Sequence, residues 1–264
     1  MIPKKIHYVW VGTTEKPDSV IKCIESWKKY CPDYEIIEWG NEEFEKIKNK
    51  YARQAFENKK WAFVSDYIRL YALYNHGGIY LDTDVEITQN IDRFLVHDFV
   101  SGFEKWKDIY SPVTAFMGAK QEHKIIKDLL EYYLIHEFET KDGLDMEPNT
   151  KRISNYFMKN FGLKKPYDGT KTIELCKNCM IYPYYYFCTP EEGKENFAIH
   201  HFNASWLDNY DRKKLFRLGN FRISRIKLRK GKNPDILPVL SSEKLIKIFK
   251  LNANKSIMIT KKVR

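Results

Sequence analysis

Residues 65–84 read SDYIRLYALYNHGGIYLDTD, and this stretch predicts a helix that turns directly into a buried strand. Asp66 and Arg69 stand three residues apart, so on a helix they share one face. The sequence from Asn75 to Gly78 suits a helix end in the left-handed conformation. The apolar run that follows has the length and composition of a strand. A helix that passes at once into a buried strand is typical of α/β domains.

Two aspartates, Asp82 and Asp84, end this strand. On a strand, side chains two residues apart point the same way, so the two carboxylates would repel each other. At the carboxyl end of a strand in an open α/β sheet they would face the crevice where ligands bind. A divalent cation such as Mg²⁺ or Mn²⁺, which prefers oxygen ligands, would relieve the repulsion. The alternative is a solvated acidic turn, with Asp66 and Arg69 forming a surface ion pair of little energetic value.

Outward from this stretch, the sequence alternates between strand and helix patterns. We expect strands over residues 4–12 and 34–39 and helices over residues 17–32 and 41–75. Further strands are expected over 97–104 and 111–119, and late strands or extended edges over 180–188 and 195–206. A further helix is expected over 123–138, and a loop with a helix over 144–162. The alternation predicts an α/β fold with a mostly parallel central sheet flanked by helices.

Bulk composition excludes several classes of protein. With 264 residues, 43% of them hydrophobic and 15% aromatic, the chain can bury a large core. It has no run of about 18 apolar residues, so we predict no membrane-spanning helix. The start, MIPKKIHYVWVG, is too short an apolar segment for a signal peptide. An odd number of scattered cysteines then indicates reduced thiols in the cytoplasm.

Positive charge is concentrated at the end of the chain. Residues 207–264 contain 17 Lys and Arg against 4 Asp and Glu, whereas residues 1–206 contain 28 against 31. A nearly neutral body with a strongly basic tail suggests a polyanionic partner, either anionic lipid or nucleic acid.

We therefore predict two parts: a catalytic domain over residues 1–210 and a basic amphipathic segment over residues 211–264. Residues 212–232 place apolar side chains between basic ones, and residues 241–250 suggest a short helix that begins at serine. The tail is accordingly expected to be helical and to lie on a membrane surface.

The stretch over residues 65–84 closely resembles the sugar-binding, D-x-D-containing region of glycosyltransferase family 32, which is related to the clostridial glucosylating toxins. The match comprises S-D-x-x-R, then Leu, then G-G-x-Y-x-D-x-D. The start IPKKIHYVWVG resembles the family's opening strand, and AIHHFNASW resembles its closing metal-site motif. The resemblance implies a GT-A type, Rossmann-like nucleotide-sugar-binding fold with a basic helical C-terminal appendage.

The resemblance also implies roles for residues on the donor side. Trp10 would stack on the nucleobase; read without the resemblance, it is equally an ordinary core tryptophan. Asp66 and Arg69 would bind the donor sugar and its phosphate surroundings. Tyr80 and Asp82 would approach the ribose and the sugar. Asp66, Arg69 and Asp82 are therefore the predicted catalytic residues.

The metal side is carried over in the same way. Asp84 would ligate Mn²⁺ or Mg²⁺ directly, together with Asp82 and a histidine. His200 and His201 are adjacent, so on an extended segment only one can enter the site, and the family spacing favours His200. The family pattern also places two further substrate-binding residues near the donor phosphates, Ser205 and Trp206.

The function that the resemblance implies is a retaining, metal-dependent hexosyltransferase that uses front-face attack. The donor would be a UDP-hexose or UDP-N-acetylhexosamine, and the acceptor a lipid-linked capsule or lipopolysaccharide precursor. The enzyme would then work in the cytoplasm, peripheral to the inner face of a bacterial plasma membrane, without binding nucleic acid. Two alternatives stay open: a phosphatase that uses the D-x-D aspartate as nucleophile, and a non-enzymatic protein that binds polyanions.

Overall fold

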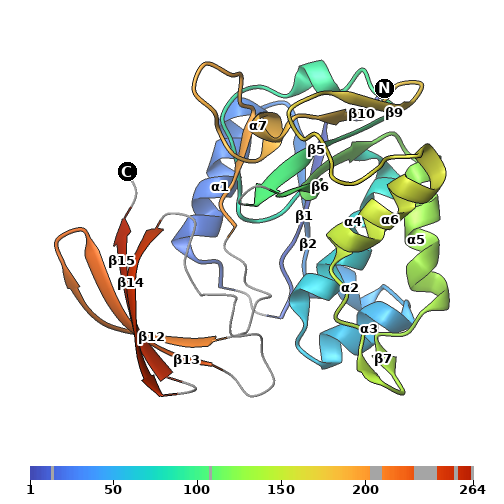
Figure 1. The fold of residues 1–264 in the computed structure, drawn as a ribbon. Coiled ribbons are helices and arrows are strands. Elements are labelled where there is room, and N and C mark those ends of the chain that lie inside the picture. Colours follow the sequence, from blue (N-terminus) through green and yellow to red (C-terminus); the bar gives the residue numbers. More distant parts are fainter. Residues whose placement is uncertain (13–14, 107–108, 203–209, 229–242, 253–254, 263–264) are drawn as a thin grey trace. The chain divides into compact units, whose positions relative to one another are not determined.

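In the computed structural model, helix α4 (Trp61–His76) ends at Gly77 and strand β3 (Gly78–Leu81) begins at the next residue (Figure 1). Gly77 and Gly78 have φ angles of 62° and 107°. A Cβ atom on Gly78 would lie 2.8 Å from the carbonyl oxygen of Lys5. Glycine is therefore required by both conformation and space, and the predicted turn from helix to strand is present.

The chain forms two units, Met1–His200 and His201–Arg264, so the structural division comes before the boundary predicted at residue 210. The structure describes residues 1–12, 15–106, 109–202, 210–228, 243–252 and 255–262. Within the described residues, no helix combines the length and the apolar character needed to cross a membrane.

The first unit is built on a seven-stranded sheet with the strand order β2-β1-β3-β6-β5-β10-β9. Besides β3, its strands are β1 (Lys5–Val9), β2 (Glu35–Trp39), β5 (Phe99–Trp106), β6 (Ile109–Ala119), β9 (Ile173–Cys176) and β10 (Cys179–Tyr182). The strands β2, β1, β3, β5 and β10 run in one direction, and β6 and β9 run in the other. The predicted fold class, an α/β fold with a mostly parallel sheet, is confirmed.

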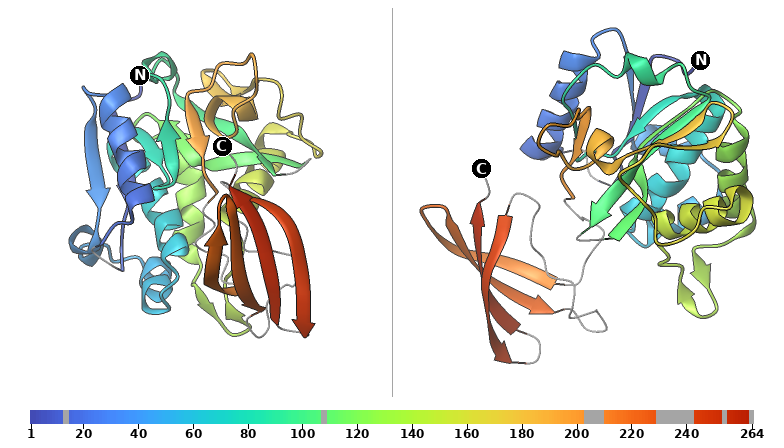
Figure 2. Two further views of the ribbon diagram at one scale, coloured as in Figure 1. Left: turned by 90° about the vertical axis from the view of Figure 1, so that its left-hand side faces the viewer. Right: turned by 45° about the horizontal axis from the view of Figure 1, so that its top comes forward.

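Helices cover both faces of this sheet (Figure 1, Figure 2). Besides α4, they are α1 (Asp18–Tyr30), α2 (Asn41–Glu45), α3 (Lys50–Glu57), α5 (Lys124–Ile135), α6 (Asn149–Phe161) and α7 (Tyr184–Phe187), with a 3₁₀ turn at Asp92–Phe94. Helices α3 to α6 pack into one hydrophobic core, whereas α1 packs into a second core through Cys23 and Trp27. The indole Nε1 of Trp27 donates to the carbonyl of Val85 at 2.8 Å.

Two short strand pairs complete the first unit. Strand β4 (Val85–Ile87) pairs antiparallel with β11 (Ala198–His200), and β7 (Glu139–Thr140) pairs with β8 (Gly143–Leu144). The pairing of β4 with β11 brings the segment after the D-x-D motif beside a segment more than a hundred residues later in the chain.

The second unit is an antiparallel sheet with the order β12-β13-β15-β14. Its strands are β12 (Tyr210–Leu218), β13 (Phe221–Leu228), β14 (Glu243–Asn252) and β15 (Lys255–Lys262). The predicted helical appendage is therefore wrong, including the short helix over residues 241–250. Isoleucine, phenylalanine, serine and threonine alternate with basic residues here, which favours strands. Gly219, with φ at 55°, and Asn220 form a two-residue hairpin turn between β12 and β13.

The two faces of the second sheet differ in exposure. One face carries buried side chains: Ser224, Ile226, Met258 and Thr260. The opposite face carries exposed or half-buried apolar side chains and exposed basic ones. Its apolar members are Phe216, Leu218, Phe221, Ile223, Phe249, Ile257 and Ile259, and its basic members are Arg225, Lys227, Lys247, Lys255 and Lys261. We call this set the apolar–basic face.

Candidate active site

The D-x-D motif forms a tight turn between β3 and β4. The amide of Asp82 donates to the carbonyl of Ala115 at 2.9 Å, and the amide of Val85 donates back to the carbonyl of Asp82 at 3.0 Å. Asp82 and Asp84 thus follow the end of β3 instead of extending it. Strand alternation was expected to orient the two aspartates. In the structure, a turn at the carboxyl end of β3 brings them together instead.

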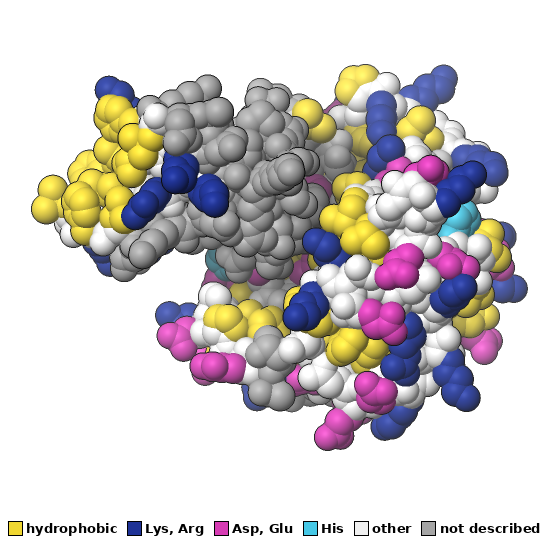
Figure 3. Space-filling model, turned by 90° about the horizontal axis from the view of Figure 1, so that it is seen from below, with side chains coloured by type: hydrophobic (Ala, Val, Ile, Leu, Met, Phe, Trp, Pro, Cys, Tyr) yellow, Lys and Arg dark blue, Asp and Glu magenta, His cyan; other side chains and the backbone are white. Residues whose placement is uncertain are grey.

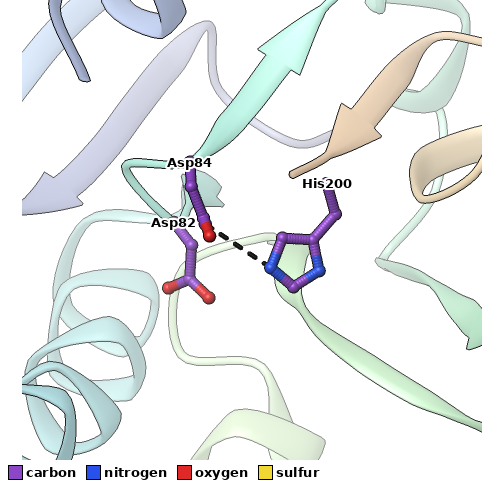
Figure 4. A group of neighbouring side chains, drawn as sticks. All are labelled: Asp82, Asp84 and His200. Atoms are coloured by element: carbon purple, nitrogen blue, oxygen red, sulfur yellow. Dashed lines mark ion pairs between the residues drawn. The ribbon is translucent and has the colours of Figure 1, made fainter. Parts of the chain in front are cut away.

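His200 comes to this turn from β11, where it pairs with Val85. Its Nε2 lies 3.4 Å from Oδ1 of Asp84. One ligand atom each from Asp82, Asp84 and His200 lie within 4.8 Å of one another, and Figure 4 shows the three side chains converging. Among the described residues, this cluster includes His200 and not His201. Two carboxylate oxygens and one imidazole nitrogen are a donor set that suits Mn²⁺, and Mg²⁺ less well.

A buried ion-pair network lies behind the turn. Nη2 of Arg69, which is 3% exposed, lies 3.2 Å from Oδ1 of Asp66 and 3.1 Å from Oδ1 of Asp82. The hydroxyl of Tyr80 donates to the same Asp82 oxygen at 2.9 Å, and the guanidinium of Arg69 lies 4.6 Å from the Tyr80 ring centre. Arg69 thus joins the helix residue Asp66 to the D-x-D residue Asp82, so these two residues are not a surface pair.

Burial sets the protonation of this network. It raises the pKa of Asp66 to about 6, although the charge of Arg69 acts in the opposite direction. Burial likewise raises the pKa of Tyr80, with a further contribution from the charge of Asp82. Burial alone would lower the pKa of His200, but hydrogen bonds with Asp84 and Cys188 and the nearby carboxylates outweigh it and hold that pKa well above its ordinary value. The carboxylates therefore attract positive charge to the position between Asp84 and His200.

Glu104 belongs to the same site but was not singled out from the sequence. Its Oε2 lies 3.9 Å from Nδ1 of His200. Burial raises the pKa of Glu104 to about 7, and the charges of Asp82 and Asp84 add to the effect while His200 opposes it. The sequence signal was present, because Glu104 follows the apolar run of β5 and the carboxyl ends of parallel strands meet at one edge of a sheet.

Three further residues were predicted to bind the substrate, namely Trp10, Ser205 and Trp206. Trp10 follows β1 and packs, half-buried, against the second core. Its Nε1 is buried and has no hydrogen-bond acceptor among the described residues. Ser205 and Trp206 lie outside the described residues, so their roles stay predictions.

Residues 17–101 match the protein family described as "glycosyltransferase sugar-binding region containing DXD motif". The matched stretch contains the D-x-D turn and the residues of α4 that support it. The resemblance predicted from the sequence is confirmed for this part of the chain.

Two curated relatives share part of the chain. Inositol phosphoceramide mannosyltransferase 3 of Schizosaccharomyces pombe is 34% identical over 98 residues, which cover 36% of this chain and 27% of that protein. An uncharacterised glycosyltransferase of Acanthamoeba polyphaga mimivirus is 28% identical over 132 residues, which cover 47% of this chain and 53% of that protein. The chain thus spans about half, or less, of the length of these relatives.

Among solved structures, a glycosyltransferase involved in the glycosylation of the major capsid of PBCV-1 has a TM-score of 0.41 at 14% sequence identity. That similarity covers 76% of this chain and 94% of that one. The PaToxG glycosyltransferase has a TM-score of 0.39 at 22% identity, covering 49% of this chain and 59% of that one.

Proposed function

We propose that this chain, whose residues 17–101 match the glycosyltransferase sugar-binding region with its DXD motif, transfers a sugar from a nucleotide sugar to a hydroxyl group of a glycan acceptor. The observation that carries the proposal is the grouping of Asp82, Asp84 and His200 within 4.8 Å, beside the buried ion pair of Arg69 with Asp66. The first group suits a cation on a diphosphate, and the second offers a carboxylate to sugar hydroxyls.

Asp84 and His200 would hold the cation most directly. Asp82 would contribute to the cation with only part of its carboxylate, because its Oδ1 already accepts hydrogen bonds from Arg69 and Tyr80. A Mn²⁺ or Mg²⁺ ion held by these residues would supply Lewis-acid stabilisation of the negative charge on the departing diphosphate. Holding the two aspartates at fixed positions before the donor arrives reduces the reorganisation that the reaction needs.

The donor sugar would lie against Asp66 and Arg69. Asp66 offers carboxylate oxygens to the sugar hydroxyls, and Arg69 keeps that carboxylate and Asp82 in place. Trp10 would stack on the nucleobase from its half-buried position after β1. Ser205 and Trp206 keep their proposed role near the donor phosphates.

Transfer replaces one bond to the anomeric carbon with another. The bond from that carbon to the phosphate oxygen breaks, the bond to the acceptor oxygen forms on the same face, and the departing diphosphate takes the acceptor proton. An α-linked donor then yields an α-linked product. Retention rests on the resemblance to family 32, and Asp66, Arg69 and Asp82 contribute by holding the sugar in position.

We expect a UDP-hexose or UDP-N-acetylhexosamine to stabilise the protein only when Mn²⁺ is present. A ligand at about a hundred times its Kd stabilises the folded state by about 2.7 kcal/mol. The measurement is thermal unfolding with UDP-sugars, GDP-mannose or ATP, each with Mn²⁺ or with EDTA. Equal stabilisation by all nucleotides, or by none, would contradict the proposed donor site.

The apolar–basic face of the second unit would dock on an anionic membrane surface. Phe216 and Leu218 are 55% and 70% exposed, and Figure 3 shows hydrophobic and basic side chains together on the described part of this unit. The ammonium groups of Lys247 and Lys261 lie 4.9 Å and 5.8 Å from the ring centres of Phe249 and Phe221. Exposed apolar side chains among cations favour lipid over nucleic acid, which has no apolar interior to receive them.

Docking would place the catalytic unit close to lipid-linked acceptors. The name of the yeast relative, an inositol phosphoceramide mannosyltransferase, refers to a lipid, which supports an acceptor of this kind. A capsule or lipopolysaccharide precursor at the inner face of a bacterial plasma membrane is the acceptor and location that we propose.

We expect Arg225→Gln/Lys261→Gln to lower binding to vesicles that contain phosphatidylglycerol. Each basic residue near such a surface contributes roughly 1 kcal/mol, so the loss should be roughly 30-fold. Vesicle flotation measures the effect. Ile135→Ser, at a 79% exposed position on α5, is the matched surface control and should bind normally. Equal binding to neutral vesicles, or binding to oligonucleotides without binding to vesicles, would rule out lipid docking.

A further inference from the structure

Glu104 is a buried carboxylate to which the proposed reaction assigns no role. Along β5, Phe99 and Phe103 enter one hydrophobic core and Val100 enters the other, so Glu104 falls on the Val100 side. That side also receives β4, which follows the D-x-D turn, and β11, which ends at His200. The Glu104 side chain is only 20% exposed. A carboxylate withdrawn from water in this way is costly unless it has a partner.

The partner that the geometry offers is His200. The Nε2 atom of its ring faces Asp84 at 3.4 Å, and the Nδ1 atom faces Glu104 at 3.9 Å. The backbone of His200 is fixed separately, because its amide donates to the carbonyl of Cys188 at 2.9 Å and β11 pairs with β4. The orientation of the ring therefore depends on the side chains around it, which are Asp84, Glu104 and Cys188.

The two nitrogens cannot serve the same purpose. A neutral imidazole that gives the lone pair of one nitrogen to a cation carries its hydrogen on the other nitrogen. Histidine ligands of metals usually donate that second N–H to a carboxylate, a carbonyl or water, which fixes the tautomer and the orientation of the ring. In this site the lone pair has to be on Nε2, since Nε2 faces the aspartates. The hydrogen is then on Nδ1, opposite Glu104.

We propose that Glu104 is the positioning residue of the cation site. It accepts the Nδ1 hydrogen of His200 and so keeps the Nε2 lone pair directed at Asp82 and Asp84. The inference rests on the proposed function, because it assigns Glu104 to the cation and not to the sugar. At 3.9 Å the two groups lie just beyond hydrogen-bond distance, and the flexible glutamate side chain can approach to that distance.

Two substitutions separate this role from others. Glu104→Gln keeps an oxygen that accepts a hydrogen bond but removes the charge, whereas Glu104→Leu removes the acceptor at similar size. The measurement is the affinity of the full chain for Mn²⁺ alone, followed by the electron paramagnetic resonance signal of free Mn²⁺. We expect Glu104→Leu to weaken Mn²⁺ binding by about 10- to 100-fold and Glu104→Gln to weaken it several-fold less. Turnover at saturating Mn²⁺ should largely recover in both variants.

Matched controls exclude less specific effects. Glu174→Gln, on β9, removes one negative charge from another strand of the same sheet and should leave Mn²⁺ affinity unchanged. Without metal, neither Glu104 variant should unfold at a lower urea concentration than the wild type, since each removes a buried charge near Asp82 and Asp84. A lower midpoint would show a structural role and overturn the proposal.

Three other outcomes would also overturn it. Unchanged Mn²⁺ affinity in both variants would show that Glu104 does not position His200. Equal weakening in both would show that its charge, or direct ligation, matters instead of its acceptor oxygen. Lost turnover with intact Mn²⁺ affinity would assign Glu104 to the sugar. If the wild type itself binds no Mn²⁺, the proposed cation site is wrong. That result is distinct from a failure of the Glu104 proposal, in which the wild type binds Mn²⁺ and the variants do not behave as expected.

Discussion

Asp84→Ala is expected to abolish the Mn²⁺-dependent release of nucleoside diphosphate, lowering kcat by roughly 10³-fold. Asp84 supplies the D-x-D oxygen that faces Nε2 of His200 at 3.4 Å. Asp82 cannot replace it, because its Oδ1 already accepts from Arg69 and Tyr80. The measurement is diphosphate release from the cognate nucleotide sugar over a Mn²⁺ titration, and the apparent affinity for Mn²⁺ should fall together with kcat.

Glu86→Gln is the matched control for this substitution. It removes a negative charge from β4, close in sequence to Asp84, without removing a predicted ligand. Most of the turnover and its dependence on Mn²⁺ should remain. Turnover of Asp84→Ala at wild-type Mn²⁺ concentrations would refute the assignment of Asp84 as a metal ligand. The same loss in Glu86→Gln would show that only the local charge matters.

The sequence predicts the early part of the first unit well because its signals there are local, whereas the segment 180–188, predicted as a strand or extended edge, contains helix α7. The helix stop at Gly77 and Gly78 is a local signal, because glycine readily adopts positive φ angles. The steric need for glycine is visible only in the fold, since the neighbours of Gly78 come from β1. The alternation of strand and helix patterns leads in the same way to an α/β fold with a mostly parallel sheet. The spacing of Asp66 and Arg69 predicts a shared helix face, and the structure adds that Arg69 is buried and reaches Asp82.

The other half of the site depends on pairings between distant segments. His200 meets Asp84 because β11 pairs with β4, and Glu104 joins them from β5, which is separated from β3 by β6 in the central sheet. Hydrophobic periodicity describes each segment but not which segments become neighbours. For Glu104, the usable signal was a charged residue at the end of an apolar strand on the same sheet edge as D-x-D.

The prediction for the second unit failed because basic and apolar residues intermingle in both amphipathic helices and half-exposed strands. The Gly219–Asn220 pair between two alternating runs is a hairpin signal, and it outweighs the helical interpretation. A sheet changes the functional interpretation as well. It gathers basic residues from separate strands, such as Arg225 and Lys261, on one face, where a single helix would present residues close in sequence.

Arg69→Met is expected to lower the free energy of unfolding by roughly 3–5 kcal/mol. Arg69 is 3% exposed and forms ion pairs with Asp66 and Asp82, whose side chains are 12% and 27% exposed. Its removal leaves two like charges close together without their shared cation. Urea unfolding of the metal-free protein near neutral pH measures the loss. Arg93→Met is the matched control, since Arg93 pairs with Glu195 at the surface, where both side chains are more than half exposed, and should contribute no more than about 1 kcal/mol.

The pH dependence of this loss identifies its cause. The pKa of Asp66 is raised by burial from 3.8 to about 6 in the folded protein, so its ionisation destabilises the fold as the pH rises through this range. Without Arg69 the folded-state pKa of Asp66 rises further. The deficit of Arg69→Met should then be largest near neutral pH and should shrink toward about pH 4 as Asp66 takes up a proton. Adding Asp66→Asn should restore part of the stability near neutral pH. A deficit that is constant with pH and unaffected by Asp66→Asn would mean that lost packing, and not uncompensated charge, destabilises the variant.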